Sequence, residues 1–191
     1  PIYSYGAAVA LLLARALAAP GGPGVASLWL YEPTPFAALR ALPPADLPEP
    51  VQAQLLQLYG PGSVLLDTSL AGQDTWLQTF IDYWNGPGTW QAVPERVRQG
   101  ARSLSQKMFH EVQALSNLAP GFAQLTVGVP VTLVHGEHTH PPARHMAESL
   151  AAHMPDAQLE SLTGLGHMGV MGGPPAVRDS LARHWQRVTT A

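Results

Sequence analysis

The sequence predicts an α/β fold in which helices flank a parallel sheet and a helical segment is inserted between two strands. Apolar runs of strand length lie at 25–31, 129–135 and 158–162. Helical patterns alternate with these runs, at 6–19, 142–154 and 174–188. Such alternation is typical of a parallel sheet with right-handed crossovers. Only helical patterns follow the first run, so we expect a core of residues 1–33 and 121–191 and a helical insertion over 34–120.

The first helical pattern, over 6–19, is apolar nearly all round, which predicts a buried helix. Its run AAVALLLARALAA contains Arg15 and is shorter than the roughly 18 apolar residues of a membrane-spanning helix. A signal peptide carries its positive charge before the apolar run, not inside it. Prolines and glycines at 20–24 end the helix, and VASLWLY at 25–31 then predicts a fully buried strand.

Residues 34–120 carry helical patterns around 50–59, 73–84 and 94–117, separated by segments rich in glycine and proline. Aromatic residues gather in the middle of this region, at Trp76, Phe80, Tyr83, Trp84 and Trp90. We expect these rings first to pack the insertion and second to line a pocket.

In the last third of the chain, predicted strands and helices alternate again. The run VPVTLVH at 129–135 predicts a strand, and apolar residues at helical spacing over 142–154 predict an amphipathic helix. A short strand at 158–162 leads into Thr163–Gly169, and a helix over 174–188 presents one apolar face.

Composition narrows the classes of function. Of 191 residues, 46% are hydrophobic and 12% are charged, which is typical of a globular protein. The net charge of −3 and the lack of a basic run argue against nucleic-acid binding. Without cysteine the chain has no disulfide, thiolate metal site or cysteine nucleophile. We expect a bacterial, cytoplasmic protein that acts on a small molecule without a membrane segment; its oligomeric state stays open.

Residues able to carry chemistry lie where predicted strands end. In parallel sheets the active site forms at the carboxyl ends of the strands, which here are followed by Glu32, by residues 136–140 and by His167. Ser4 directly precedes the first helix. A hydroxyl nucleophile needs a base, and the base needs a carboxylate to orient it. Ser4, an acid and His167 would supply these parts in the order nucleophile, acid, histidine.

Three stretches resemble the α/β-hydrolase superfamily. Tyr3–Ala10 (YSYGAAVA) resembles the nucleophile elbow and its helix, Val131–Glu137 (VTLVHGE) the strand and turn before the usual acid, and Gly164–Gly169 (GLGHMG) the catalytic-histidine loop. The helical insertion lies where that superfamily places its cap domain. The resemblance covers nearly the whole chain but only the C-terminal part of the family fold, which implies an N-terminally truncated hydrolase.

The sequence departs from the family pattern at two positions. Ile2 stands where the elbow pattern G-x-S-x-G has its first glycine, which predicts a distorted elbow. Thr139 stands at the position of the usual acid and cannot act as a carboxylate. Some members carry the acid at the end of the strand after the elbow helix, a place that Glu32 matches. We rank Glu32 first as the acid and Glu137 second; alternatively, Glu32 merely contacts the cap or pocket.

His135, His138 and His140 are spaced so that they could converge on zinc, but no second ligand cluster accompanies them. We therefore expect no metal and no cofactor.

A serine at the nucleophile position implies hydrolysis of an ester, lactone or thioester, or of a carbon–carbon bond beside a ketone. Ser4 would attack the carbonyl, His167 would take and return the proton, and the backbone N–H of Tyr5 would form half of the oxyanion hole. Two alternatives remain. The chain could be a non-catalytic binding module on the same fold, or a fragment without function that exposes a strand edge and the flank of its first helix.

Overall fold

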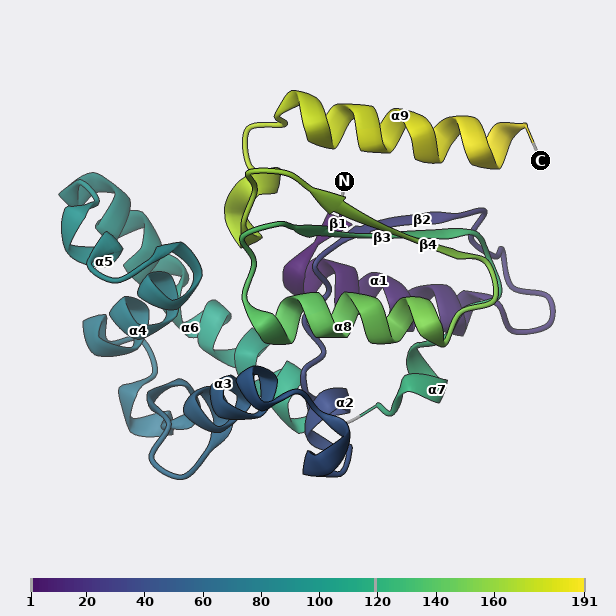
Figure 1. Ribbon diagram of the computed structural model, residues 1–191. Coiled ribbons are helices and arrows are strands. Elements are labelled where there is room, and N and C mark those ends of the chain that lie inside the picture. Colours follow the sequence, from purple (N-terminus) through teal and green to yellow (C-terminus); the bar gives the residue numbers. More distant parts are fainter. Residues whose placement is uncertain (1, 119, 191) are drawn as a thin grey trace.

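The computed structural model describes residues 2–118 and 120–190. Its strands form one parallel sheet in the order β1-β2-β3-β4, from Ile2–Tyr3, Leu28–Tyr31, Val131–Gly136 and Ala157–Leu162. Figure 1 shows α9 (Pro175–Thr189) on one face of the sheet and α1 (Ser4–Leu17) with α8 (Pro141–Ala152) on the other. The predicted α/β architecture is confirmed.

The register of the sheet aligns the carboxyl ends of its strands. Tyr3 pairs with Tyr31, Tyr31 with Val134, and Val134 with Glu160. The residues that follow β1, β2 and β3 therefore leave the sheet along one edge. β2 begins at Leu28, later than the predicted start at residue 25, because Leu28 is the residue that pairs with Val131, the first residue of β3.

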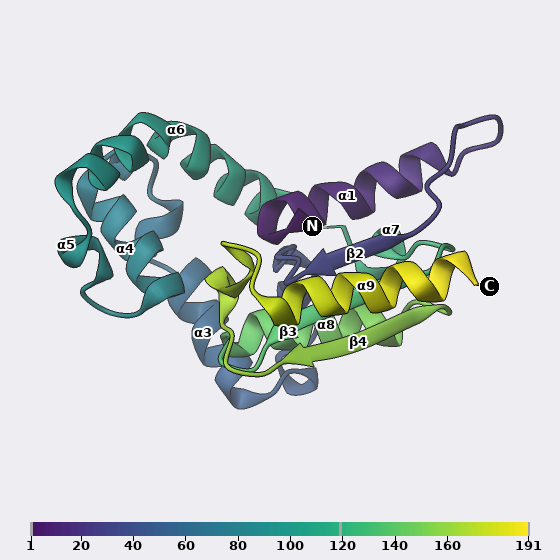
Figure 2. The ribbon, with the colours of Figure 1, turned by 90° about the horizontal axis from the view of Figure 1, so that it is seen from above.

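Within the part of the chain that the structure describes, residues 34–118 form helices joined by turns and contribute no strand. The α-helices there are α2 (Ala37–Arg40), α3 (Glu49–Tyr59), α4 (Asp74–Asn85), α5 (Thr89–Ala92) and α6 (Glu95–Asn117), and α7 (Phe122–Leu125) then leads to β3. The short helices α2, α5 and α7 were not predicted because a single turn shows no periodicity. Figures 1 and 2 show α3 to α6 beyond the carboxyl ends of the strands.

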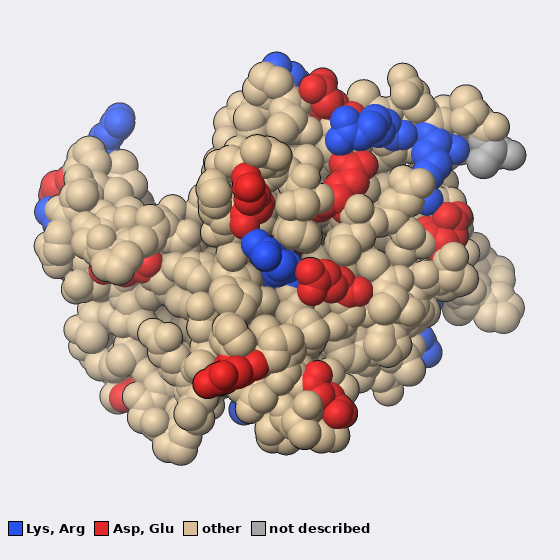
Figure 3. Space-filling view, viewed as in Figure 1, with Lys and Arg blue, Asp and Glu red and all other residues tan. Residues whose placement is uncertain are grey.

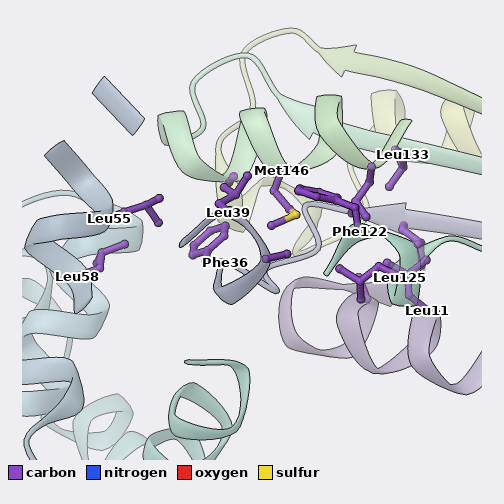
Figure 4. Packing of buried hydrophobic residues seen from close by; sticks show 14 of the residues in the cluster. Leu11, Phe36, Leu39, Leu55, Leu58, Phe122, Leu125, Leu133 and Met146 are labelled. Carbon is purple, nitrogen blue, oxygen red and sulfur yellow. The ribbon is translucent and has the colours of Figure 1, made fainter. Parts of the chain in front are cut away.

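A single buried cluster joins the sheet to the helical segment. It includes Leu11 of α1, Leu133 of β3, Met146 of α8, Leu39 of α2 and Leu55 of α3. Figure 4 shows these side chains following one another from the sheet toward α3. Burying each such side chain stabilises the fold by about 1.5–3 kcal/mol. This shared packing sets where the helical segment sits relative to the strand ends.

One flank of α1 is exposed. Ala7, Ala8 and Leu11 are buried, but Val9 is 41% and Leu13 is 53% exposed. The prediction of a helix buried all round is therefore wrong for this flank. The reason is the sheet order: β1 is the edge strand beside α1, so the sheet among the described residues does not extend over the outer side of the helix.

The opposite face of the sheet packs against α9. Trp29 of β2 donates from Nε1 to Oγ of Ser180 at 2.9 Å. His184 bridges two other residues, with Nδ1 2.8 Å from Oγ1 of Thr132 and Nε2 3.1 Å from Oγ of Ser27. These buried polar contacts fix α9 along the strands.

On the face seen in Figure 3, acidic and basic side chains are scattered among uncharged ones, with both signs close together. Among the described residues, no helix is both long enough and apolar enough to cross a membrane.

Candidate active site

Ser4 is the first residue of α1 and lies at the strained turn that joins this helix to β1. Its φ is +53°, a left-handed conformation that non-glycine residues rarely adopt and that is typically found at functional turns. Ile2 pairs in register with Leu30, so the distortion predicted from Ile2 is not found. Ile2 Cγ2 lies 3.5 Å from where Gly6 would carry a Cβ, so the elbow is close-packed at this point. The turn therefore presents Ser4 at the carboxyl edge of the sheet.

His167 begins a short 3-10 turn, His167–Val170, after β4. The loop before it is held to two neighbouring strands. Tyr31 donates from its hydroxyl to the carbonyl oxygen of Gly166 at 2.6 Å, and the backbone N–H of His138 donates to the carbonyl oxygen of Leu165 at 2.8 Å. Burial, reinforced by the charge of Glu32, raises the pKa of Tyr31, so its hydroxyl remains a donor.

Gly136, the last residue of β3, makes the close approach of this loop possible. A Cβ at this position would lie 2.2 Å from the carbonyl oxygen of Leu165 and 2.9 Å from Oη of Tyr31. The glycine of the HGE stretch therefore lets the histidine loop pack directly on the end of β3.

Glu32 follows β2 and is fully buried, with φ at +44°. Its carboxylate has a partner at each oxygen. Oε1 accepts from the backbone N–H of Gly136 at 2.8 Å, and Oε2 accepts from Oγ1 of Thr139 at 2.6 Å. Oε2 also lies 2.7 Å from Nδ1 of His167. A buried carboxylate is costly unless it is hydrogen-bonded in this way.

The imidazole of His167 joins this carboxylate to Ser4. Its Nε2 lies 3.0 Å from Oγ of Ser4, while Nδ1 faces Glu32. The carboxylate accepts a hydrogen bond from Nδ1–H, which leaves the lone pair of Nε2 directed at the serine hydroxyl. The three side chains, which follow β2, β4 and β1, are thus in one hydrogen-bonded chain.

Tyr5 is the second residue of α1. The N–H groups in the first turn of a helix have no carbonyl partner within the helix, and the helix dipole favours negative charge there. The backbone N–H of Tyr5 is therefore placed next to Ser4 at an end of α1 suited to an oxyanion.

Glu137, the second-ranked acid, bonds elsewhere. Its Oε2 accepts from the backbone N–H of Gly164 at 2.8 Å, and its side chain is 49% exposed. The structure thus brings Glu32, and not Glu137, to His167.

The histidines after β3 have separate partners. Nδ1 of His135 lies 3.0 Å from the carbonyl oxygen of Gly136, Nε2 of His140 lies 2.5 Å from that of Tyr83, and the side chain of His138 is 68% exposed. Burial lowers the pKa of His140. In residues 2–118 and 120–190, no three histidine, aspartate or glutamate side chains gather to hold a metal ion.

A hollow adjoins Ser4 and extends into the helical segment. Its walls are mainly aromatic and aliphatic, and include Phe36, Leu58, Leu65, Phe80, Tyr83, Trp84 and Val112. Trp76 and Trp90 are instead buried in the packing of the helices. The aromatic residues thus serve both purposes expected from the sequence.

Two contacts of the site were missed by the sequence reasoning. Trp84 stacks on His167, with 3.6 Å between ring centroids, and Thr139 donates to Glu32. The first depends on how α4 folds back over the sheet, which local spacing does not encode. The sequence did hold a signal for the Thr139–Glu32 contact. Thr139 stands at the position of the usual acid in the resemblance, and that position lies near the histidine.

No protein-family model matches the sequence, and the search of curated proteins found no match either. Solved structures do match. A haloalkane dehalogenase from Agrobacterium tumefaciens superposes with a TM-score of 0.60 at 18% identity, covering 97% of this chain and 65% of the other. An esterase from Thermogutta terrifontis gives 0.53 at 21% identity, with 97% and 62% covered.

An α/β hydrolase from Sphaerobacter thermophilus gives a TM-score of 0.53 at 20% identity, with 96% of this chain and 65% of the other covered. The chain therefore has the α/β-hydrolase fold, as the resemblance predicted. It spans 62% to 65% of the length of these three structures, and so represents part of that fold.

Proposed function

We propose that this chain is the catalytic part of a serine hydrolase in which Ser4 is the nucleophile, His167 the base and Glu32 the acid that orients it. The observation that carries the proposal is the continuous chain of contacts from Ser4 Oγ through His167 to Glu32, at 3.0 and 2.7 Å. The positive φ of Ser4 at the start of a helix supports the same assignment.

The proposed reaction is an acyl transfer in which the serine proton moves to the histidine and then to the leaving group. Oγ of Ser4 bonds to the substrate carbonyl carbon, its proton passes to Nε2 of His167, and Glu32 stabilises the imidazolium. The carbonyl oxygen becomes negative and accepts from the backbone N–H of Tyr5. The bond between the carbonyl carbon and the leaving group then breaks, and Nε2 returns the proton to the leaving group. Water repeats these steps on the acyl-serine, which releases the acid and restores Ser4.

The shape of the site favours an apolar acyl group. The hollow beside Ser4 is walled chiefly by Phe36, Leu58, Phe80 and Trp84, which match an uncharged chain or ring. We infer that residues 34–120 act as a cap on the core formed by 1–33 and 121–191. The proposed substrates are esters, thioesters or lactones with such an acyl group, or compounds cleaved at a carbon–carbon bond beside a ketone.

The alternative of a non-catalytic binding module rested on Ile2 and Thr139. Ile2 lies in a paired strand and Thr139 donates to the proposed acid, so neither departure argues against catalysis. Binding of a small molecule without turnover would be the result that restores this alternative.

The test uses the 191-residue chain with a fluorophosphonate probe and p-nitrophenyl esters of increasing acyl length. We expect the probe to label Ser4 and the esters to turn over, with both signals lost in Ser4→Ala and retained in Ser103→Ala, a change at an exposed helix serine. A folded chain that neither labels nor hydrolyses any ester would contradict the proposal.

A further inference from the structure

Thr139 lies in the loop after β3 and is buried, with 7% of its surface exposed. Its hydroxyl donates to Oε2 of Glu32 at 2.6 Å. That oxygen is the one that faces Nδ1 of His167 at 2.7 Å. One carboxylate oxygen thus accepts hydrogen bonds from both the threonine hydroxyl and the histidine Nδ1–H.

The two donors that hold Glu32 besides His167 come from one turn of chain. The backbone N–H of Gly136 holds Oε1, the hydroxyl of Thr139 holds Oε2, and the backbone N–H of Thr139 donates to the carbonyl oxygen of Gly136 at 3.2 Å. Because Glu32 is fully buried, water is not at hand to replace a lost donor. Removing the hydroxyl would leave Oε2 with the imidazole as its sole partner.

We propose that Thr139 is a positioning residue, which acts through Glu32 by fixing Oε2 toward Nδ1 of His167. The inference rests on the proposed function for its effect on turnover, but its effect on the Glu32–His167 hydrogen bond does not depend on catalysis. Charge-assisted hydrogen bonds are short and hold their geometry well, and this one is 2.6 Å long.

The kinetic experiment compares Thr139→Val, which keeps the shape of the side chain without a donor, with Thr139→Ser, which keeps the hydroxyl. Losing a hydrogen bond to a charged group corresponds to about a tenfold or larger effect. We expect kcat to fall by about that much in Thr139→Val with little change in KM, and to stay within about threefold of the parent in Thr139→Ser. Equal kcat in the parent and in Thr139→Val, or equal loss in both variants, would overturn the role.

Proton NMR of the Nδ1–H of His167 separates this inference from the proposed function. We expect its low-field signal to move or broaden in Thr139→Val and to be kept in Thr139→Ser. An unchanged signal in Thr139→Val refutes the positioning role even if the chain proves to have no turnover. Ser4 labelling by the fluorophosphonate reports on the proposed function separately.

Thr139→Ala serves in place of Thr139→Val if the valine variant does not fold.

Discussion

The indole ring of Trp84 lies on the imidazole ring of His167, with 3.6 Å between the ring centroids and 24° between the ring planes. Trp84 belongs to α4 of the helical segment, whereas His167 follows β4 of the sheet. The side chain of Trp84 also lines the hollow beside Ser4. A residue of the proposed cap is therefore in direct contact with the proposed base.

We expect Trp84→Ala to lower kcat by about tenfold and Trp84→Phe to stay within about threefold of the parent. An aromatic face stabilises a desolvated cation by up to about 2 kcal/mol, and the proposed mechanism forms an imidazolium at His167. Steady-state kinetics with a short ester would measure this, together with a thermal melt of each variant. Equal kcat in the alanine and phenylalanine variants would argue against a role for the ring face.

The two candidate acids can be separated by matched amide variants. We expect Glu32→Gln to lower kcat by about a thousandfold or more, since the amide can neither stabilise the imidazolium nor hold the same tautomer. Glu137→Gln should keep kcat, because Glu137 is half-exposed and bonds to the N–H of Gly164. Rates under saturating ester check both. A larger loss in Glu137→Gln than in Glu32→Gln would reverse the assignment.

Gly136→Ala tests the close approach of β3 and the histidine loop. The added Cβ would lie 2.2 Å from the carbonyl oxygen of Leu165, so the loop must move. We expect a loss of about 1–3 kcal/mol in the free energy of unfolding, with reduced activity. Urea denaturation measures the first. Gly128→Ala is the matched control, since no atom lies within 4 Å of a Cβ there, and its stability should match the parent.

The stability of the fold should decline on mild acidification. Burial and the nearby charge of Arg187 lower the pKa of His184 from its ordinary value of 6.5. The unfolded chain therefore binds a proton at a higher pH than the folded chain does, so stability is full above pH 6.5 and falls as the pH decreases below it. We expect the melting temperature to drop from pH 7 to pH 5, and less so in His184→Gln.

His138→Gln is the control for this pH dependence, because its side chain is 68% exposed. A His138→Gln profile parallel to that of the parent is expected. If His184→Gln lost as much stability between pH 7 and pH 5 as the parent does, the titration would have to be assigned to another group, such as His140, whose pKa burial also lowers.

Much of the fold and part of the site could be predicted from the sequence. The alternation of strands and helices gave the parallel sheet, and the register places Ser4 and Glu32 at the same edge. The fragment alternative expected an exposed flank on the first helix, but that Leu13 lies on this flank could not be predicted, because periodicity shows which residues are apolar and not what covers them. The Trp84–His167 contact depends on the path of the whole helical segment.

β1 consists of Ile2 and Tyr3, paired on one side to β2. Glu32 and His167, by contrast, are buried and held by contacts to β2 and β3. Local opening of β1 would carry Ser4 away and leave the acid and histidine in place. The rate of turnover would then depend on the equilibrium between closed and locally open β1. We expect activity to be lost at a lower urea concentration than the one at which tryptophan fluorescence changes. A single shared midpoint would instead show that β1 opens only with the whole chain.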